Sequence, residues 1–453
     1  MPFMRSALLA ALALAAVHSS EAVAAPVLMI SIDGLRADDI TKAQEHGLAI
    51  PTLRALAASG ARAEGVRGVL PTITYPSHTT MITGVHPAKH GIAGNTTFDP
   101  EGRNMGGWMW YAQDIKVPTL WDTVKAKGGI VASLGWPVSV GKAEIDYNIP
   151  EFWRARIPED EKLLRAVSTP GMPDEMARST GVSFAAVALD PGETHEPMDD
   201  SRMTWVPAMI ARYKPQFMTV HLITLDGTRH KYGPYSPQAK AVLENIDRGL
   251  KTMIEKARAA QPDLVVAIVS DHGFSPISKG LNLVAALASE GLVRFDENGK
   301  VAGWSAYPWL MGGSAAIILK DPADQATAGR VKALLDKLAA NPANGIDKVL
   351  GPADIARLGG TADAAFWVSM KSGYSVAGGS GPALLRDVSG GTHGYSPESD
   401  EMLSVFFLTG PGIARTDLHQ IDMRDIAPTI GDVLGAPLPN PDGKVLPVKA
   451  GAR

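Results

Sequence analysis

Short apolar runs alternate along the chain with segments in which apolar residues recur every three or four positions. The runs have the length of buried strands, and the segments between them have the period of helices that cover a sheet. This pattern predicts strands at 27–32, 130–134, 217–225, 264–269, 315–319 and 403–408, and helices at 52–58, 119–127, 239–260 and 326–339. The alternation predicts an α/β fold with a mostly parallel central sheet and helices on both faces.

The polar, glycine-rich stretch at 373–391 interrupts this pattern and indicates loops or a covering lobe. We therefore expect one catalytic domain over residues 25–453, with a smaller inserted lobe within about 275–390. Large α/β enzymes often reach this length around a single sheet.

Three of the predicted strands are followed by an aspartate. Asp33 comes after the first run, Asp226 after 217–225, and Asp271 with His272 after 264–269. A single aspartate at such a position most often caps a turn or a helix. In open α/β sheets, however, ligands bind at the carboxyl ends of the strands, so three such ends with a glycine nearby favour one shared site.

Histidine and carboxylate are the metal ligands that this chain can offer, because it contains no cysteine. Asp226 and His230 are four residues apart, so a helical turn there would direct both side chains to one ion. Asp271 and His272 form a second pair, and His393 lies in a glycine loop that can bring one imidazole inward. Each pair alone is weak evidence, because a lone histidine is more often a core or capping residue.

Hydroxyl side chains gather in the segment 70–84, which contains two prolines and ends in a Ser/Thr-rich stretch. That stretch predicts a capped helix through 79–83. A helix N-terminus presents free backbone N–H groups to a phosphoryl oxygen, although an ordinary Ser/Thr-capped turn has the same composition.

The N-terminus has the pattern of a secretory signal peptide over residues 1–24: a short basic start, an apolar stretch and a small-residue cleavage site. An uncleaved membrane helix is the alternative. An exported chain without disulfides is compatible with a bacterial periplasm, so we expect a periplasmic or secreted protein with no stable membrane anchor. The net charge of −4 gives no sign of a nucleic-acid-binding surface.

The motifs, taken in order, resemble the nucleotide pyrophosphatase/phosphodiesterase family of the alkaline phosphatase superfamily. The resemblance covers most of the chain after the signal segment and runs through the segments 31–36, 71–78, 86–95, 134–137, 226–234, 270–274 and 391–395. It implies an alkaline phosphatase-like fold and an enzyme that cleaves phosphodiester or phosphoanhydride bonds of a small-molecule or nucleotide substrate.

The resemblance also implies two zinc ions. One would be held by Asp226, His230 and His393, and the other by Asp33, Asp271, His272 and the hydroxyl of Thr74. Thr74 would be the nucleophile and would form a phosphothreonine, which water activated at the first zinc ion would then hydrolyse. Manganese and iron accept the same oxygen and nitrogen ligands, so the identity of the metal rests on the resemblance.

Two more residues of these motifs are expected to contact the substrate. Asn95 would donate its amide to a phosphoryl oxygen, together with the backbone N–H of Thr74. Tyr75 stands where the family has an aromatic residue beside the nucleophile, and it would either stack on the leaving group or pack in the core. His78, His86 and His90 lie at positions that the family uses structurally.

Several alternatives stay open at this point. A phosphomonoesterase with a threonine nucleophile is the main rival; such enzymes add Lys and Arg for a dianionic phosphate, and Lys142 leaves room for that reading. A non-catalytic metal- or phosphate-binding relative is the second. The aromatic residues at 108–111 and 152–153 would line the substrate entrance or pack in the core. The sequence does not identify the substrate or the oligomeric state.

Overall fold

The computed structural model describes residues 24–105, 107–155, 157–189 and 196–450. Apart from Ala24, the predicted signal peptide lies outside the described residues. Within them, no helix combines the length and the apolarity that crossing a bilayer would require.

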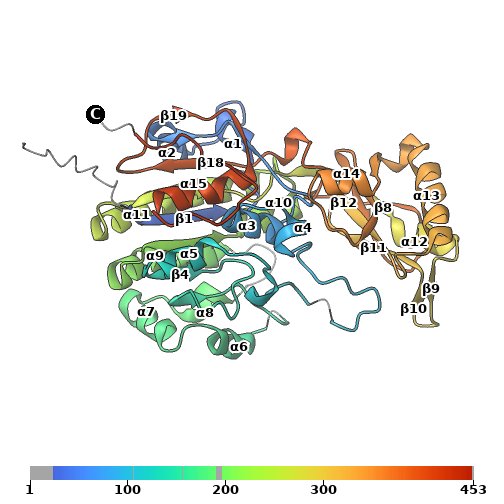
Figure 1. Cartoon of the computed structure of the whole chain (residues 1–453), viewed down its shortest axis with the longest axis horizontal. Helices are drawn as coiled ribbons and strands as arrows, with labels where there is room; N and C mark the ends of the chain where they lie inside the picture. The colour runs from blue at the N-terminus through green and yellow to red at the C-terminus, as the bar shows by residue number, and fades with distance from the viewer. Residues whose placement is uncertain (1–23, 106, 156, 190–195, 451–453) are drawn as a thin grey trace, which may run out of the picture.

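An eight-stranded sheet forms the centre of the molecule (Figure 1). Its strands, in spatial order, are β19 (Thr416–Asp417), β2 (Ala61–Arg62), β18 (Phe406–Thr409), β7 (Val265–Val269), β1 (Val27–Ile32), β6 (Phe217–Leu222), β4 (Val131–Leu134) and β5 (Tyr147–Ile149). The strands from β7 to β5 are all parallel, and β18 pairs antiparallel with β7. The prediction of a mostly parallel central sheet is therefore confirmed.

Both faces of the sheet are buried from β18 to β4, which explains why these strands are mostly continuous apolar runs. In β1, Leu28 and Ile30 face one core cluster, whereas Val27 and Met29 face the other, as the two-residue period of a strand requires. The first cluster is covered by α2 (Pro51–Ser59), α6 (Asp160–Val167), α7 (Met172–Thr180), α8 (Phe184–Ala188), α9 (Glu196–Tyr213) and α11 (Pro237–Ala260). The second is covered by α3 (Thr74–Thr83), α5 (Leu120–Ala126) and α15 (Ile426–Val433).

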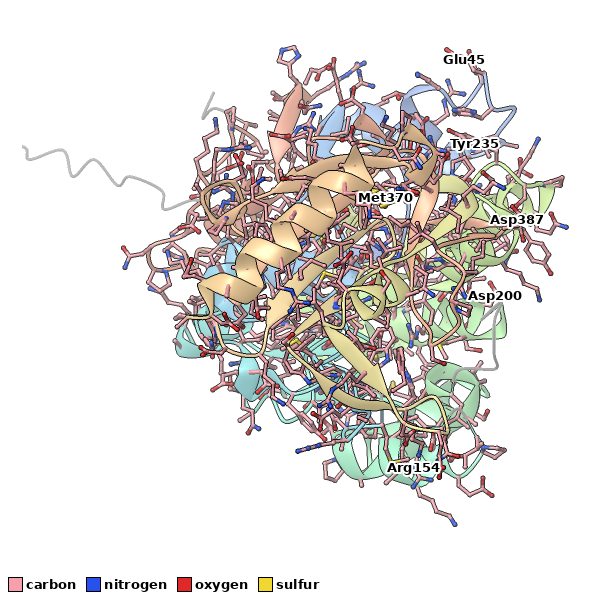
Figure 2. All side chains as sticks on the ribbon, turned by 90° about the vertical axis from the view of Figure 1, so that its right-hand side faces the viewer. Glu45, Arg154, Asp200, Tyr235, Met370 and Asp387 are labelled. Carbon is pink, nitrogen blue, oxygen red and sulfur yellow. The ribbon has the colours of Figure 1, made fainter. Side chains whose placement is uncertain are left out.

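A smaller lobe lies beside the large sheet, in yellow and orange in Figure 1. Its antiparallel sheet has the order β11 (Ala306–Leu310), β12 (Ser314–Leu319), β14 (Ala364–Met370), β13 (Ile346–Leu350), and it packs with α12 (Leu283–Ser289), α13 (Gln325–Ala339) and α14 (Pro352–Arg357). A smaller sheet joins β15 (Gly373–Ala377), β8 (Ser275–Asn282), β16 (Leu385–Asp387) and β17 (Gly391–Thr392). Figure 2 looks onto this side of the molecule, with Met370 labelled near the middle.

This lobe also contacts the segment that leads into α3. Leu70 and Ile73 pack in one apolar cluster with Met311, which follows β11, and with Trp367 of β14. The lobe therefore borders the region of the predicted nucleophile.

Three element boundaries differ from the predictions by three residues or more. Strand β6 ends at Leu222 rather than at 225, because the Asp199 carboxylate accepts the backbone N–H groups of Ile223 and Thr224 at 3.0 and 2.9 Å, and α10 (Thr224–Tyr232) begins there. Helix α3 begins at Thr74 rather than near residue 79. The C-terminal strand begins at Phe406 rather than at 403.

Candidate active site

The first turn of α3 carries Thr74, the predicted nucleophile. Thr74 is the first helical residue. Ile73 before it is in extended conformation, and its apolar side chain makes no capping hydrogen bond. The backbone N–H of Tyr75 donates to Asn95 Oδ1 at 2.9 Å, and Pro76 has no N–H. Among the described residues, none accepts a hydrogen bond from the backbone N–H of Thr74. A bound anion can therefore accept from it.

Asn95 is oriented by this same contact. Because its oxygen accepts from Tyr75, its amide NH₂ end faces the opposite way and is available as a donor. The backbone of Asn95 is fixed as well, since its carbonyl accepts from Met109 N at 2.9 Å. Two N–H donors, one from Thr74 and one from Asn95, are therefore held at the start of α3.

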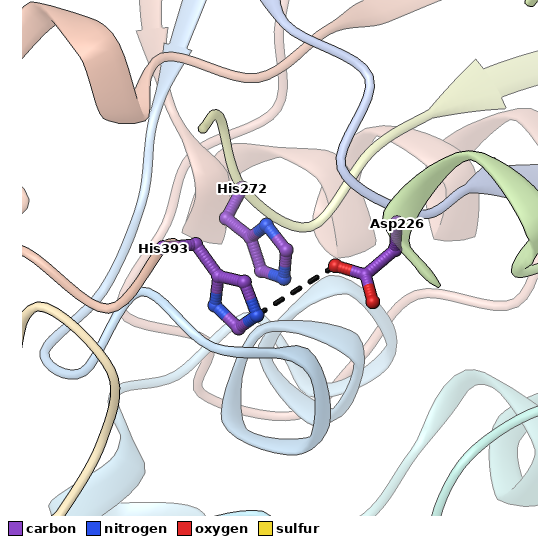
Figure 3. A group of neighbouring side chains, drawn as sticks. All are labelled: Asp226, His272 and His393. Atoms are coloured by element: carbon purple, nitrogen blue, oxygen red, sulfur yellow. Dashed lines mark ion pairs between the residues drawn. The ribbon is translucent and has the colours of Figure 1, made fainter. Parts of the chain in front are cut away.

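Asp226 and His230 lie one turn apart on α10, and His393 approaches them from the loop after β17. His230 Nε2 lies 3.5 Å from Asp226 Oδ1 and 3.2 Å from His393 Nε2, and His393 Nε2 lies 3.6 Å from Asp226 Oδ1. Figure 3 shows Asp226 and His393 directed at each other, with His272 beside them. These three predicted ligands are therefore neighbours in space.

Asp33, Asp271 and His272 form a second group at the carboxyl ends of β1 and β7. His272 Nε2 lies 3.4 Å from Asp33 Oδ1 and 3.1 Å from Asp271 Oδ2, while Asp271 Oδ1 accepts from Gly34 N at 3.1 Å. The ring of His272 also stacks on that of His393, with centroids 3.6 Å apart. His272 was assigned to this group alone, but its position brings it within reach of Asp226 and His393 as well.

The backbone of Thr72 and Thr74 is linked to one proposed ligand of each group. His78 Nδ1 donates to the Thr74 carbonyl at 2.8 Å and lies 3.7 Å from Asp271 Oδ2. On the other side, His393 Nδ1 donates to the carbonyl of Thr72 at 3.2 Å. The backbone at the start of α3 therefore contacts His393 directly and is linked to Asp271 through His78.

The tautomers of the three histidines suit a metal. Each imidazole donates its Nδ1–H to a backbone carbonyl, namely His230 to Gly391 at 3.0 Å, His272 to Gly273 at 3.1 Å and His393 to Thr72 at 3.2 Å. The Nε2 atoms thus carry lone pairs, so the 3.2 Å contact between His230 Nε2 and His393 Nε2 brings two acceptors together. A cation between them turns this repulsion into two bonds.

Buried acceptors without a hydrogen bond lead to the same conclusion. Asp33 Oδ1, Asp271 Oδ2 and His272 Nε2 are buried and have no hydrogen-bond partner among the residues that the structure describes. Leaving such groups unsatisfied is costly, and they are three of the atoms that would ligate an ion. The residues present therefore fit one or two divalent cations.

The electrostatics of the protein alone also call for a cation. Burial raises the pKa of Asp33 well above its ordinary value, and the nearby Asp271 and Asp226 carboxylates raise it further. Burial lowers the pKa of His272 and of His393 well below the ordinary value, which keeps both imidazoles neutral, the form that binds metal.

The histidines that we expected to be structural make only internal hydrogen bonds where they are fully buried. His78 bonds the Thr74 carbonyl and Ser31 Oγ, each at 2.8 Å, and burial lowers its pKa to about 3. His90 accepts from Ile92 N and contacts Thr80 Oγ1, each at 3.1 Å, and its pKa is also lowered to about 3 by burial.

Tyr75 has no exposed surface, which bears on its predicted contact with the substrate. Its hydroxyl donates to Glu151 Oε1 at 2.9 Å, and its ring meets Trp108 edge to face with centroids 5.2 Å apart. Trp108 in turn contacts Trp153 at 4.8 Å, so partly exposed aromatic rings cover Tyr75. Stacking of Tyr75 on a substrate stays a prediction, and it requires the residues packed on the ring to expose it.

Two buried residues near the site were missed by the sequence analysis. His221 Nε2 lies 3.0 Å from Asp33 Oδ2, and its Nδ1 lies 2.8 Å from Glu151 Oε2. The available signal was a histidine inside an apolar strand, since a buried imidazole needs a polar partner.

Lys142, which had left a phosphomonoesterase possible, pairs with Asp122 at 2.6 Å and with Glu144 at 3.0 Å.

Comparison with known proteins gives one family. The family model for type I phosphodiesterase / nucleotide pyrophosphatase matches residues 27–396. Ectonucleotide pyrophosphatase/phosphodiesterase family member 1 from Mus musculus is 24% identical over 261 residues, which are 55% of this chain and 24% of that protein. Venom phosphodiesterase from Naja atra is 24% identical over 264 residues, 56% of this chain and 26% of its own length. The chain thus spans about a quarter of these relatives.

Solved structures support the fold. Human ectonucleotide pyrophosphatase/phosphodiesterase 5 superposes with a TM-score of 0.64 at 19% identity, covering 92% of this chain and 97% of that one. An inactive variant of the murine protein in complex with AMP gives a TM-score of 0.64 at 18% identity, with 93% and 97% covered. The expected alkaline phosphatase-like fold is confirmed.

Proposed function

The chain belongs to the type I phosphodiesterase / nucleotide pyrophosphatase family, and we propose that it is an exported two-zinc enzyme that cleaves phosphodiester or phosphoanhydride bonds through a phosphothreonine on Thr74. One observation carries the proposal: carboxylates and imidazole lone pairs from four separate segments converge beside the first turn of the helix that begins at Thr74.

The proposed ligands are those of the resemblance. Asp226, His230 and His393 would hold one zinc ion, and Asp33, Asp271, His272 and the Thr74 hydroxyl the other. When bound, the two ions would lower the pKa of the threonine hydroxyl and neutralise charge on the phosphoryl group.

The residues of the chain then supply attack and stabilisation. Thr74 Oγ attacks phosphorus in line with the leaving oxygen; the new Oγ–P bond forms as the bond to the leaving alcohol or phosphate breaks, giving phosphothreonine. Water then attacks the same phosphorus and restores the Thr74 hydroxyl. In both steps the Thr74 N–H and the amide of Asn95 donate to the phosphoryl oxygens, where charge increases.

The contacts of Lys142 favour a diesterase over a monoesterase. A terminal phosphate carries one more negative charge than a diester, so an enzyme for monoesters gains from an added cation. Lys142 is occupied by Asp122 and Glu144. For the substrate we propose a nucleotide or a related small phosphodiester, since the murine neighbour binds AMP.

Thr74→Ala tests the nucleophile. We expect turnover of bis-p-nitrophenyl phosphate to fall by at least about 10³-fold, since alanine has no group to attack phosphorus. Thr83→Ala is the matched control, because Thr83 is a buried threonine of the same helix whose hydroxyl donates only to the Thr79 carbonyl at 2.7 Å. A Thr74→Ala enzyme that keeps its activity would exclude the phosphothreonine.

Substrate class and metal are tested on the wild type. We expect a higher kcat/KM for bis-p-nitrophenyl phosphate than for p-nitrophenyl phosphate, and the reverse would make the chain a phosphomonoesterase. EDTA should abolish hydrolysis and zinc should restore it. Metal analysis of the purified protein should give two zinc ions per chain.

Export and domain organisation complete the proposal. We propose a single catalytic domain over residues 25–453, with its covering lobe within about 275–390, released into the periplasm or medium after cleavage of residues 1–24. Names of relatives such as ectonucleotide pyrophosphatase and venom phosphodiesterase support a location outside the cytoplasm. N-terminal sequencing of the protein from a periplasmic extract tests both cleavage and location.

A further inference from the structure

We propose that Glu151 and His221 are positioning residues, which hold the Asp33 carboxylate in place for its metal and link it to the nucleophile-bearing helix through Tyr75. This inference rests on the proposed function, in which Asp33 is a metal ligand.

A continuous chain of buried hydrogen bonds carries the proposal. The Tyr75 hydroxyl donates to Glu151 Oε1 at 2.9 Å, Glu151 Oε2 lies 2.8 Å from His221 Nδ1, and His221 Nε2 lies 3.0 Å from Asp33 Oδ2. The exposed fractions of Tyr75, Glu151, His221 and Asp33 are 0, 6, 1 and 3%. Water therefore has little access to these contacts, and each is stronger than it would be at the surface.

The chain of contacts leaves one Asp33 oxygen for an ion. His221 occupies Oδ2, whereas Oδ1 is buried, has no hydrogen-bond partner in the described part of the chain, and lies 3.4 Å from His272 Nε2. A histidine that occupies one carboxylate oxygen fixes the rotation of the group, so that the other oxygen points in one direction. Partners of this kind orient the residues that bind a metal directly.

Four elements meet in this chain of contacts, which gives it a mechanical role. Tyr75 lies in the first turn of α3, Glu151 two residues after β5, His221 on β6 and Asp33 directly after β1. β1 and β6 are paired, with Ser31 opposite His221. The position of Asp33 is thereby set relative to residue 75, next to the nucleophile, rather than by the end of β1 alone.

Packing alone does not account for these residues. An apolar side chain would fill the place of His221 in a strand whose other buried residues are mostly apolar, and it would avoid the cost of burying an imidazole between two carboxylates. A buried imidazole at this cost is expected where it has a functional role, such as holding a residue of the site.

Zinc affinity of the apo protein separates a positioning role from a structural one. Wild type, His221→Leu, Glu151→Ala and Glu151→Gln are stripped of metal and titrated with zinc in competition with a chromogenic chelator. His90→Gln is the matched control, since His90 is equally buried and hydrogen-bonded but contacts none of the proposed ligands.

The expected result is selective. His221→Leu and Glu151→Ala should weaken the binding of one of the two zinc ions by about 10- to 100-fold and leave the affinity for the other unchanged. Glu151→Gln should keep near wild-type zinc affinity. The glutamine oxygen can accept from the Tyr75 hydroxyl and its NH₂ group can donate to His221 Nδ1, which leaves the Nε2–H of His221 for Asp33. His90→Gln should lose stability but no zinc affinity.

The failures are distinguishable. If wild type itself binds fewer than two zinc ions, the proposed function fails. If wild type binds two, and His221→Leu and Glu151→Ala bind both as tightly, the positioning role is refuted while the function stands. Should His221→Leu not fold, the comparison of Glu151→Ala with Glu151→Gln decides the question.

Discussion

Replacing Asn95 separates its effect on the helix from its effect on the reaction. Its oxygen accepts the Tyr75 N–H at 2.9 Å, and its NH₂ end is the proposed donor to the phosphoryl group. Alanine removes both functions. Aspartate keeps an acceptor for Tyr75 but puts a negative oxygen where the donor was.

The two variants should therefore change stability and rate in opposite orders. Asn95→Ala should lose about 1 kcal/mol of unfolding free energy, as for a lost N-terminal helix cap, and about 10²–10³ in kcat. Asn95→Asp should remain near wild-type stability, because a carboxylate at a helix N-terminus is favourable by about 0.3–1 kcal/mol. Its rate should fall further than that of the alanine variant, since two like charges about 4 Å apart repel by about 4 kcal/mol at an effective dielectric constant of 20.

Urea unfolding gives the stability and bis-p-nitrophenyl phosphate turnover gives the rate. Asn104→Asp is the control, because Asn104 lies exposed on the same loop and its amide donates only to Thr97 Oγ1, at 2.7 Å. An Asn95→Asp enzyme that is faster than Asn95→Ala, or within tenfold of wild type, would refute the donor role.

Three further predictions concern pH, backbone and metal. Burial lowers the pKa of His90 to about 3, whereas it is about 6.5 in the unfolded chain, so the stability that neutral His90 contributes is complete above pH 6.5 and is lost as the pH falls towards 3. The free energy of unfolding from urea curves should therefore rise with pH by about 1.4 kcal/mol per pH unit in this range because of His90, and His90→Gln should remove that slope. An unchanged slope would contradict this. Gly394 has φ +86°, and a Cβ there would lie 1.8 Å from the Met311 carbonyl, so Gly394→Ala should cost about 2–4 kcal/mol and displace His393; Gly412→Ala, at φ +74° in open space, should cost about 1–2 kcal/mol, and equal losses would be inconsistent with the clash. EDTA should lower the melting temperature, and zinc at about 100 times its Kd should restore about 2.7 kcal/mol; a melting temperature insensitive to both would mean that no ion binds the folded state.

The sequence could predict the rim of the sheet because the ends of buried parallel strands are marked by a change from apolar to acidic residues. Asp33 follows β1 and Asp271 comes two residues after β7, and the register places Ser31 beside both Val269 and His221. Asp226 was expected directly at a strand end and lies instead in the first turn of α10. The carboxylate of Asp199, 27 positions earlier in the chain, starts that helix, and such a long-range cap leaves no local signal.

Contacts between distant segments account for the rest. The start of α3 was misplaced because Asn95 supplies the acceptor for its first turn from a loop twenty residues away. His221 and Glu151 were missed for the same reason: their partners lie 188 and 76 residues away in Asp33 and Tyr75. Periodicity and spacing describe neighbours along the chain, whereas these pairs are set by the order of strands in the sheet.

The charge of the centre provides an argument for its substrate. With metal bound, Asp33, Asp226 and Asp271 would carry three negative charges, and burial lowers the pKa of His272 and His393, which keeps these two proposed ligands neutral. Two divalent cations would leave the centre with one positive charge while Thr74 keeps its proton, and a phosphodiester monoanion balances that charge when it binds. A monoester dianion would leave one negative charge in a buried site, and Lys142, the lysine that raised this possibility, is held by Asp122 and Glu144. Because an unbalanced buried charge is costly, the residues proposed to hold the metal also favour a diester as the substrate.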